Sequence, residues 1–277
     1  MKKFIRRAMG EDNAYNNRLK HLYHWQPYKF GRLRELLKTN SIYCSLPSSF
    51  NDPWDCSPQF DNTIPNSLIG NYLHKKWALK AYNKFFPAQD KNEEIRKILN
   101  DPQRSKHVID QISEATVNVV RKSKYRIYCL SPNPENLLMW SHYANSHTGI
   151  CIEYDLKKSM LFTALKCRYK TNYPSLKTYS ENTRDLLAPL LIKSDVWSYE
   201  EEYRLILSSE IDEPLLSGHQ FDPNGLLTLP KGAISSIIVG CDGPYEKIRK
   251  LVLKYAPEIK VKRAVKIPNK YAISIQE

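Results

Sequence analysis

The stretch that decides the fold class runs from Cys129 to Asp155 and reads CLSPNPENLLMWSHYANSHTGICIEYD. An apolar strand ends at Leu130, Ser131 begins a turn, and residues 136–145 form a helix before Gly149 opens a new strand. A short helix between two strands is typical of folds that mix both kinds of element along the chain. The stretch therefore indicates a sheet combined with helices.

Further strands are predicted on both sides of this stretch. Strands are expected at 22–25, 42–45, 126–130, 149–154, 202–207, 234–239 and 261–265, and helices at 30–38, 136–145 and 244–255. Apolar residues between 65 and 123 recur at helical spacing, and Asp101–Pro102 divides that part in two. We therefore predict an α+β fold with a mixed, mostly antiparallel sheet, as one domain over 1–277 with a helical insertion over 65–123.

The composition favours an anionic partner. The chain of 277 residues is 42% apolar, carries a net charge of +13 and has an isoelectric point near 9.3. Such an excess of Lys and Arg favours nucleic acid, a nucleotide or a membrane surface, with general solubility as the alternative. The basic start Met1–Arg7 is not followed by an apolar segment, and no run of about 18 apolar residues occurs. We expect a cytoplasmic protein without a membrane partner.

The cysteines and histidines do not have the spacing of a metal site. Six cysteines are scattered without a Cys-x-x-Cys pair, mostly inside apolar runs, which is typical of buried thiols. His142 and His147 are five residues apart, a poor spacing for two ligands on one helical face. We predict no metal ligands.

The segment SLPSSFNDPWD, from Ser45 to Asp55, is dense in turn-forming residues. An Asn-Asp-Pro turn such as Asn51–Pro53 can lock a loop through bonds from side chain to backbone. The aromatic residues Phe50 and Trp54 on such a turn could instead line a pocket and stack on a base or on nicotinamide. Both interpretations stay open.

Three glutamates are crowded in SYEEEYRLIL, residues 198–207. If the strand includes them, Glu200 and Glu202 project to one face and Glu201 to the other. Two carboxylates on one face can stabilise a positive charge or activate a nucleophile. The alternative is a salt bridge to Arg204, which lies on the same face.

Three stretches of the chain, which begin with LYHW, CLSP and VWSY, together resemble the bacterial family called domain of unknown function 2971. The resemblance covers about Leu22 to Gly240. The order of the motifs also resembles the more distant ADP-ribosyltransferases. Members of that superfamily carry a His or Arg on a first strand, a Ser or Tyr and a short helix after a second strand, and a Glu that opens a later strand.

This second resemblance implies an ADP-ribosyltransferase-like fold and NAD as the substrate. Glu202 would be the catalytic glutamate, because a carboxylate at the ribose stabilises the cation that forms when the nicotinamide bond breaks. Glu200 would orient or deprotonate the acceptor. His24 would bind the adenosine-side ribose and Tyr143 would stack on nicotinamide, with further cofactor-binding candidates at Ser131, Trp140 and Asn51.

We therefore expect an enzyme that transfers ADP-ribose to a macromolecule, with nucleic acid favoured over protein as the acceptor. The resemblance also implies a toxin or phage-defence effector, with a neutralising antitoxin as a partner. The alternatives are a non-catalytic nucleic-acid-binding defence module and a metal-dependent hydrolase of nucleotides. For Glu202→Gln we expect a rate loss on the order of 10² to 10³. If the Glu202 carboxylate is half-exposed, the substitution should change the free energy of unfolding by about 1 kcal/mol or less.

Overall fold

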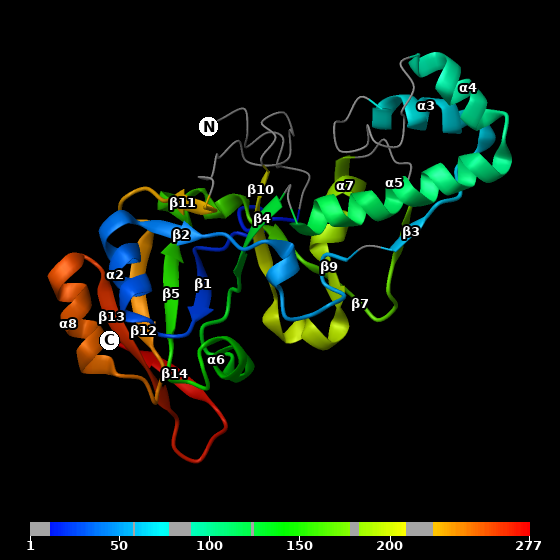
Figure 1. Cartoon of the computed structure of the whole chain (residues 1–277). Helices are drawn as coiled ribbons and strands as arrows, with labels where there is room; N and C mark the ends of the chain where they lie inside the picture. Colours follow the sequence, from blue (N-terminus) through cyan, green and yellow to red (C-terminus); the bar gives the residue numbers. More distant parts are fainter. Residues whose placement is uncertain (1–11, 58, 78–89, 123–124, 178–182, 209–223) are drawn as a thin grey trace. The chain divides into compact units, whose positions relative to one another are not determined.

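The computed structural model describes residues 12–57, 59–77, 90–122, 125–177, 183–208 and 224–277. The chain divides into two compact units. Unit 1 comprises Met1–Ser45, Arg126–Tyr169 and Asp195–Glu277, and unit 2 comprises Leu46–Tyr125 and Lys170–Ser194. The helices predicted over 65–123 fall in unit 2 (Figure 1). Among the described residues, no helix is long and apolar enough to cross a membrane.

Unit 1 is built on a five-stranded sheet. Its order is β1 (His21–Gln26), β5 (Ile150–Asp155), β12 (Ile234–Val239), β13 (Lys260–Lys266) and β14 (Ile273–Gln276). The pair β12–β13 is parallel, and α8 (Tyr245–Tyr255) provides the crossover connection that parallel neighbours need. The other pairs are antiparallel. The predicted α+β fold with a mixed, mostly antiparallel sheet is therefore confirmed.

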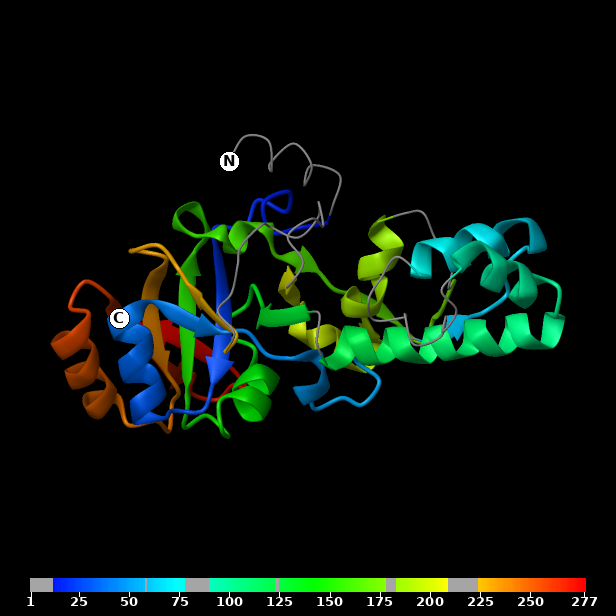
Figure 2. The ribbon, with the colours of Figure 1, turned by 45° about the horizontal axis from the view of Figure 1, so that its top comes forward.

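Helices cover both faces of this sheet (Figures 1 and 2). On one face, α2 (Phe30–Thr39) and α8 bury apolar stripes such as Leu33, Leu36 and Leu37 in the main core, which also contains Leu22 of β1. On the other face, α6 (Leu137–Tyr143) packs Trp140 against Trp25 of β1. The two faces of β1 thus belong to two different clusters, as strand alternation requires.

A second sheet of unit 1 has the order β4 (Tyr125–Leu130), β10 (Tyr203–Ser208) and β6 (Leu165–Lys166). It meets β1 at a single backbone bridge between Tyr23 and Ser131. A short pair joins β2 (Ser41–Tyr43) to β11 (Leu226–Thr228), and Ser45 after β2 bridges to β4. Strands β1, β4 and β10 are therefore lateral neighbours.

Unit 2 contains the helices α3 (Asn66–Trp77), α4 (Lys91–Leu99) and α5 (Pro102–Lys122), with Leu73, Ile98 and Ile112 fully buried among them. The Asp101 side chain accepts hydrogen bonds from the first turn of α5, so the predicted break at Asp101–Pro102 is confirmed. The remaining elements of unit 2 are η1 (Pro47–Ser49), β3 (Gln59–Asp61), β8 (Ser175–Lys177), α7 (Thr183–Leu191) and β9 (Ile192–Ser194), where η denotes a 3₁₀ turn. Strand β7 (Arg168–Lys170) begins in unit 1 and ends in unit 2, and the 3₁₀ turns of unit 1 are η3 (Leu156–Lys158), η4 (Met160–Thr163) and η5 (Asp195–Glu200).

Candidate functional site

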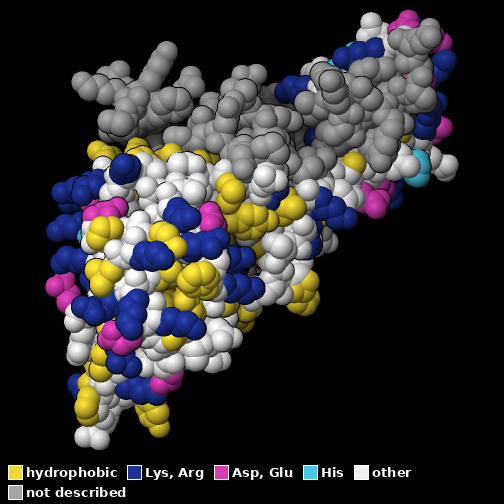
Figure 3. Space-filling view, turned by 60° about the vertical axis from the view of Figure 1, so that its left-hand side comes forward, with side chains coloured by type: hydrophobic (Ala, Val, Ile, Leu, Met, Phe, Trp, Pro, Cys, Tyr) yellow, Lys and Arg dark blue, Asp and Glu magenta, His cyan; other side chains and the backbone are white. Residues whose placement is uncertain are grey.

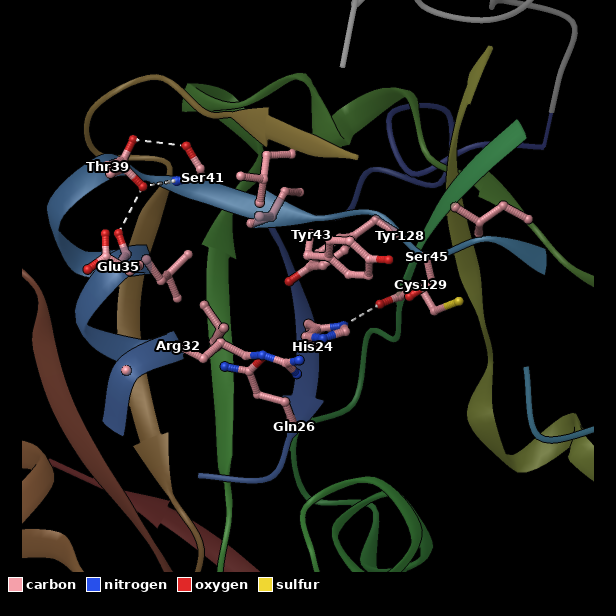
Figure 4. Close-up of a pocket in the computed structure, with 16 residues that line it drawn as sticks. His24, Gln26, Arg32, Glu35, Thr39, Ser41, Tyr43, Ser45, Tyr128 and Cys129 are labelled. Atoms are coloured by element: carbon pink, nitrogen blue, oxygen red, sulfur yellow. Dashed lines mark hydrogen bonds between the residues drawn. The ribbon is translucent and has the colours of Figure 1, made fainter. Parts of the chain in front are cut away.

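Unit 1 contains a cavity of about 610 Å³ beside α2 (Figure 4). This volume lies in the range of roughly 300–1,000 Å³ that is usual for small-molecule sites. Its lining comes from β1, α2, β2, β4, β5 and β11, and includes the polar or aromatic residues His24, Gln26, Arg32, Glu35, Thr39, Ser41, Tyr43, Ser45 and Tyr128. Of the sequence-predicted site residues, His24 is the one that lines this cavity.

The imidazole of His24 is held in one tautomer. Its Nδ1 atom lies 2.8 Å from the carbonyl oxygen of Cys129. A carbonyl can only accept, so Nδ1 carries the hydrogen and donates it, and Nε2 presents a lone pair. Burial lowers the pKa of His24 to about 4, the bond to Cys129 opposes this shift, and nearby Arg32 lowers it further. The ring is therefore neutral at physiological pH, and Nε2 can accept a hydrogen bond from a ligand.

The cavity lies where two strands part. β1 and β4 share the bridge between Tyr23 and Ser131, with both backbone bonds at 2.9 Å, and then diverge. Next to this bridge the His24 ring stacks on Tyr128 of β4, with centroids 4.3 Å apart and planes 25° apart. The side chain of His24 is thus fixed from both strands, on the face of β1 that α2 covers.

The other polar groups of the lining come mainly from α2 and β2. In Figure 4, Gln26 lies below His24, Arg32 extends toward it from α2, and Tyr43 and Tyr128 lie above it. Tyr43 is 49% exposed, and the guanidinium of Arg126 lies 5.9 Å from its ring centroid. The cavity therefore combines a neutral acceptor, a cation and an aromatic surface.

Sequence reasoning missed the contribution of α2 to this site. Arg32, Glu35, Leu36 and Thr39 recur at three- and four-residue spacing, so they share one side of the helix, and all four line the cavity. That spacing was visible in the sequence. The position of this side of α2 opposite His24 was not, because it depends on how the helix folds back on β1.

Glu202 forms a buried ion pair with Arg204. Its two carboxylate oxygens each accept one hydrogen bond at 2.9 Å, from Nε and from Nη2. The glutamate is 3% exposed and the arginine 0%. The backbone N–H of Glu202 also donates to the hydroxyl of Tyr169 at 2.8 Å. The structure therefore contains the salt bridge to Arg204 that was the alternative for Glu202. The assumption of a half-exposed carboxylate, on which the small predicted change in stability rested, is wrong.

Glu200 belongs to a second polar cluster. It ends η5, is 2% exposed, and accepts a hydrogen bond of 2.5 Å from the hydroxyl of Tyr143 on α6. Beside it, Nδ1 of His142 lies 2.8 Å from the hydroxyl of Tyr199. Tyr143 and Tyr199 pack against the core cluster that contains Trp25. Because neighbouring residues of a strand face opposite ways, this cluster and His24 lie on opposite faces of β1.

The strand predicted to begin at Glu202 begins one residue later, and the alternation predicted for the glutamates is wrong. Glu201 has a left-handed backbone with φ of 46°, between the turn η5 and strand β10. Glu200 and Glu202 are buried, and Glu201 is exposed. The left-handed residue turns one carboxylate outward between two that point inward.

The lower-ranked candidates occupy other places. Trp140 is fully buried and donates from Nε1 to the Pro134 carbonyl at 2.7 Å, so it is a core residue. Ser131 is buried, and its hydroxyl has no hydrogen-bond partner within the described ranges. Asn51 is exposed and belongs to unit 2, next to Asp52, whose side chain accepts from the Trp54 backbone. The locked-turn interpretation of this loop is therefore supported.

The potential metal ligands of the described residues are dispersed. No three His, Cys, Asp or Glu side chains gather there in a group that could hold a metal ion. Among the cysteines, Cys44, Cys56, Cys151 and Cys167 are buried, which confirms the prediction for these four thiols. Cys129 and Cys241 are partly exposed.

Comparison with known proteins gives one match. Residues 139–205 match the family model described as a protein of unknown function, DUF2971, so a DUF2971 domain is found over that segment. The segment contains Tyr143, Glu200 and the Glu202–Arg204 pair, and the cavity residue His24 lies outside it. No curated protein and no solved structure matched the chain.

Proposed function

We propose that the chain binds NAD in the His24 cavity and acts as an ADP-ribosyltransferase-like enzyme. The observation that carries the proposal is the neutral imidazole of His24, fixed through Nδ1 on Cys129 and free to accept through Nε2 in a cavity of about 610 Å³. A ribose hydroxyl is a suitable donor to such a nitrogen. Arg32, in the same lining, suits the pyrophosphate, since a guanidinium binds phosphate oxygens with paired N–H groups.

The arrangement of the strands supports the same proposal. The three sequence motifs that resemble ADP-ribosyltransferases lie on β1, at the end of β4, and before β10, and these strands are lateral neighbours. His24 also bonds directly to β4, at the Cys129 carbonyl. A cavity at the point where β1 and β4 part is where a ligand could reach both strands. Tyr43 adds an exposed ring on which a planar base could stack.

In this proposal Glu202 keeps the catalytic place that the resemblance implies. Its bidentate pairing would hold the carboxylate in one orientation, although Glu202 does not belong to the lining of the His24 cavity. The same observation favours a second candidate, a non-catalytic nucleotide- or nucleic-acid-binding module, because Arg204 occupies both carboxylate oxygens. The two candidates share the ligand cavity and differ in whether NAD is cleaved.

Nucleic acid is the proposed acceptor or partner. Figure 3 looks toward the side of unit 1 that carries α8 and shows many Lys and Arg side chains there. The α8 surface comprises the exposed residues Lys38, Lys247, Arg249, Lys250 and Lys254, with Glu246 as the one acidic residue of α8. Lys38 and Lys254 both lie over the Tyr255 ring, at 5.2 and 5.3 Å. A surface of this kind attracts phosphates without reading sequence.

Calorimetric titration with NAD tests the binding step. We expect His24→Ala to weaken NAD binding about tenfold, the effect of one lost hydrogen bond and ring contact. Because His24 is packed on Tyr128, the exposed Arg32→Ala provides a second variant that should fold normally. The matched control is Lys29→Ala, an exposed residue just before the same helix and outside the cavity lining. Equal affinity in all four proteins, or no NAD binding by the wild type, would refute the assignment.

Transfer is tested separately, with NAD labelled in the adenosine part and total RNA or cell lysate. Label on RNA together with released nicotinamide supports the enzyme, and NAD binding without cleavage supports the non-catalytic module. The variant Lys247→Glu/Lys250→Glu should reduce labelling of RNA and leave NAD affinity unchanged, because neither residue lines the cavity. RNA labelling that is unaffected by this double variant would contradict the role of the α8 surface.

A further inference from the structure

Two loops meet at one end of the five-stranded sheet. β5 begins and β12 ends at the same end, where Ile150 pairs with Val239. The loop that follows α6 and the loop that follows β12 therefore run side by side there (Figure 1). The backbone N–H of Asp242 donates to the carbonyl of His147 at 3.2 Å, and a Cβ at Gly240 would lie 2.1 Å from that carbonyl oxygen. A glycine is required for this close approach.

The contact brings a thiol and an imidazole together. The Sγ atom of Cys241 lies 3.7 Å from Nδ1 of His147, within hydrogen-bonding distance for sulfur. The His147 ring stacks on Trp140 with planes 14° apart, which restricts its orientation. Both residues are partly exposed, so a small molecule can reach the pair. The residues are 94 positions apart in the sequence, and neither has a role in the proposed NAD site.

Charged side chains surround the pair. Burial lowers the pKa of His147, Asp242 opposes this shift and Lys266 adds to it, so the contact with Cys241 is one between a thiol donor and an imidazole acceptor. Lys266 bonds to the Asp242 carboxylate at 3.1 and 3.2 Å. Arg263 donates to the Cys241 carbonyl at 3.4 Å and is exposed. These two cations would attract an anionic reagent to the thiol.

We propose that Cys241 is a reactive thiol activated by His147, and that it is a site of reversible thiolation by a small anionic disulfide of the glutathione type. His147 Nδ1 takes the proton of the thiol, and the Cys241 sulfur attacks one sulfur of the disulfide. A new S–S bond forms as the old one breaks. The departing thiolate then takes the proton from the imidazolium. The exchange is balanced, because the co-reactant is itself reduced to a thiol.

The test measures the rate of modification of the folded protein by glutathione disulfide, with peptide mass mapping to locate the adduct. At pH 7 we expect Cys241 to react at least about threefold faster than Cys129, the other partly exposed cysteine. His147→Asn is the informative variant, because Asn tolerates the φ of 64° found at this position and its amide is not a base. The matched control is His107→Asn, an exposed histidine on α5.

His147→Asn should lower the rate at Cys241 at pH 7 to that of Cys129, and His107→Asn should not. At pH 9 the wild type and His147→Asn should converge, because free thiols are largely ionised at that pH and need no neighbouring base. A merely structural role of His147 would leave the difference equal at both pH values. Equal rates at Cys241 and Cys129, or no effect of His147→Asn at pH 7, would overturn the proposal.

Discussion

Glu202→Gln is the substitution for which the structure makes the sharpest quantitative prediction. The change removes the charge opposite Arg204, whose side chain is fully buried and whose Nε and Nη2 donate to the two carboxylate oxygens. Removal of one partner of a buried ion pair typically costs about 3–5 kcal/mol. A domain is usually stable by only about 5–15 kcal/mol, so Glu202→Gln should be severely destabilised.

Urea unfolding followed by circular dichroism measures this effect, and the neighbouring glutamate supplies the control. Glu201 is exposed, so Glu201→Gln should change the free energy of unfolding by no more than about 0.5 kcal/mol. The double variant Glu202→Leu/Arg204→Met removes both charges and keeps similar volume. It should recover most of the lost stability, because replacing both partners of a buried pair by apolar groups is often neutral or stabilising.

The reasoning fails if Glu202→Gln and Glu201→Gln unfold at the same urea concentration. It also fails if the double variant is less stable than Glu202→Gln, because the charges at 202 and 204 would then not be coupled. For the same reason, activity of Glu202→Gln must be measured where the variant is still folded. A rate loss that follows the folded fraction reflects stability, whereas a loss on the order of 10² in folded protein would support the catalytic assignment.

Two further predictions concern buried carboxylates. Tyr143→Phe should lower the free energy of unfolding by about 1–3 kcal/mol in urea titrations, because Glu200 loses the donor at 2.5 Å; an unchanged midpoint would contradict this. For Glu153, burial raises the pKa, but hydrogen bonds from Lys262 and Ser236 outweigh it, so the pKa is lowered overall. A lowered carboxyl pKa gives stability above the unfolded value that is lost as pH falls through the folded value, so Glu153→Gln should flatten the acid limb of a melting-temperature profile.

The periodicity of the sequence was sufficient to place most elements of unit 1. The strand at 234–239 has the predicted bounds, β1, β4 and β13 extend the predicted strands by one residue at one or both ends, and β5 is shifted by one residue. In these strands apolar and polar residues alternate, or all residues are apolar, so the burial pattern and the local conformation both predict a strand. The predicted helix at 136–145 is shorter, Leu137–Tyr143, because its end is determined by the loop that packs on Gly240.

The candidate site could not be assembled from the sequence in the same way. Motif order predicts His24 on a first strand, Tyr143 on the helix after a second strand and Glu202 at the start of a later one, and these strands do lie near one another. It does not predict which face each side chain occupies. One-residue alternation on β1 places His24 toward α2 and Trp25 toward α6, and Tyr143 lies on α6. The contact between Cys241 and His147 has no local signal at all, since sheet pairing alone brings the two loops together.

The crowded glutamates are held by a backbone that differs from the predicted strand. A regular strand would have placed Glu200 and Glu202 on one shared face, where the two charges would repel each other. With the left-handed residue Glu201 between them, Glu200 accepts from Tyr143 and Glu202 accepts from Arg204. Each buried carboxylate thereby has its own donors, which burial of a charge requires. The cost of one strained residue, of order 1–3 kcal/mol, is smaller than the cost of an unpaired buried charge.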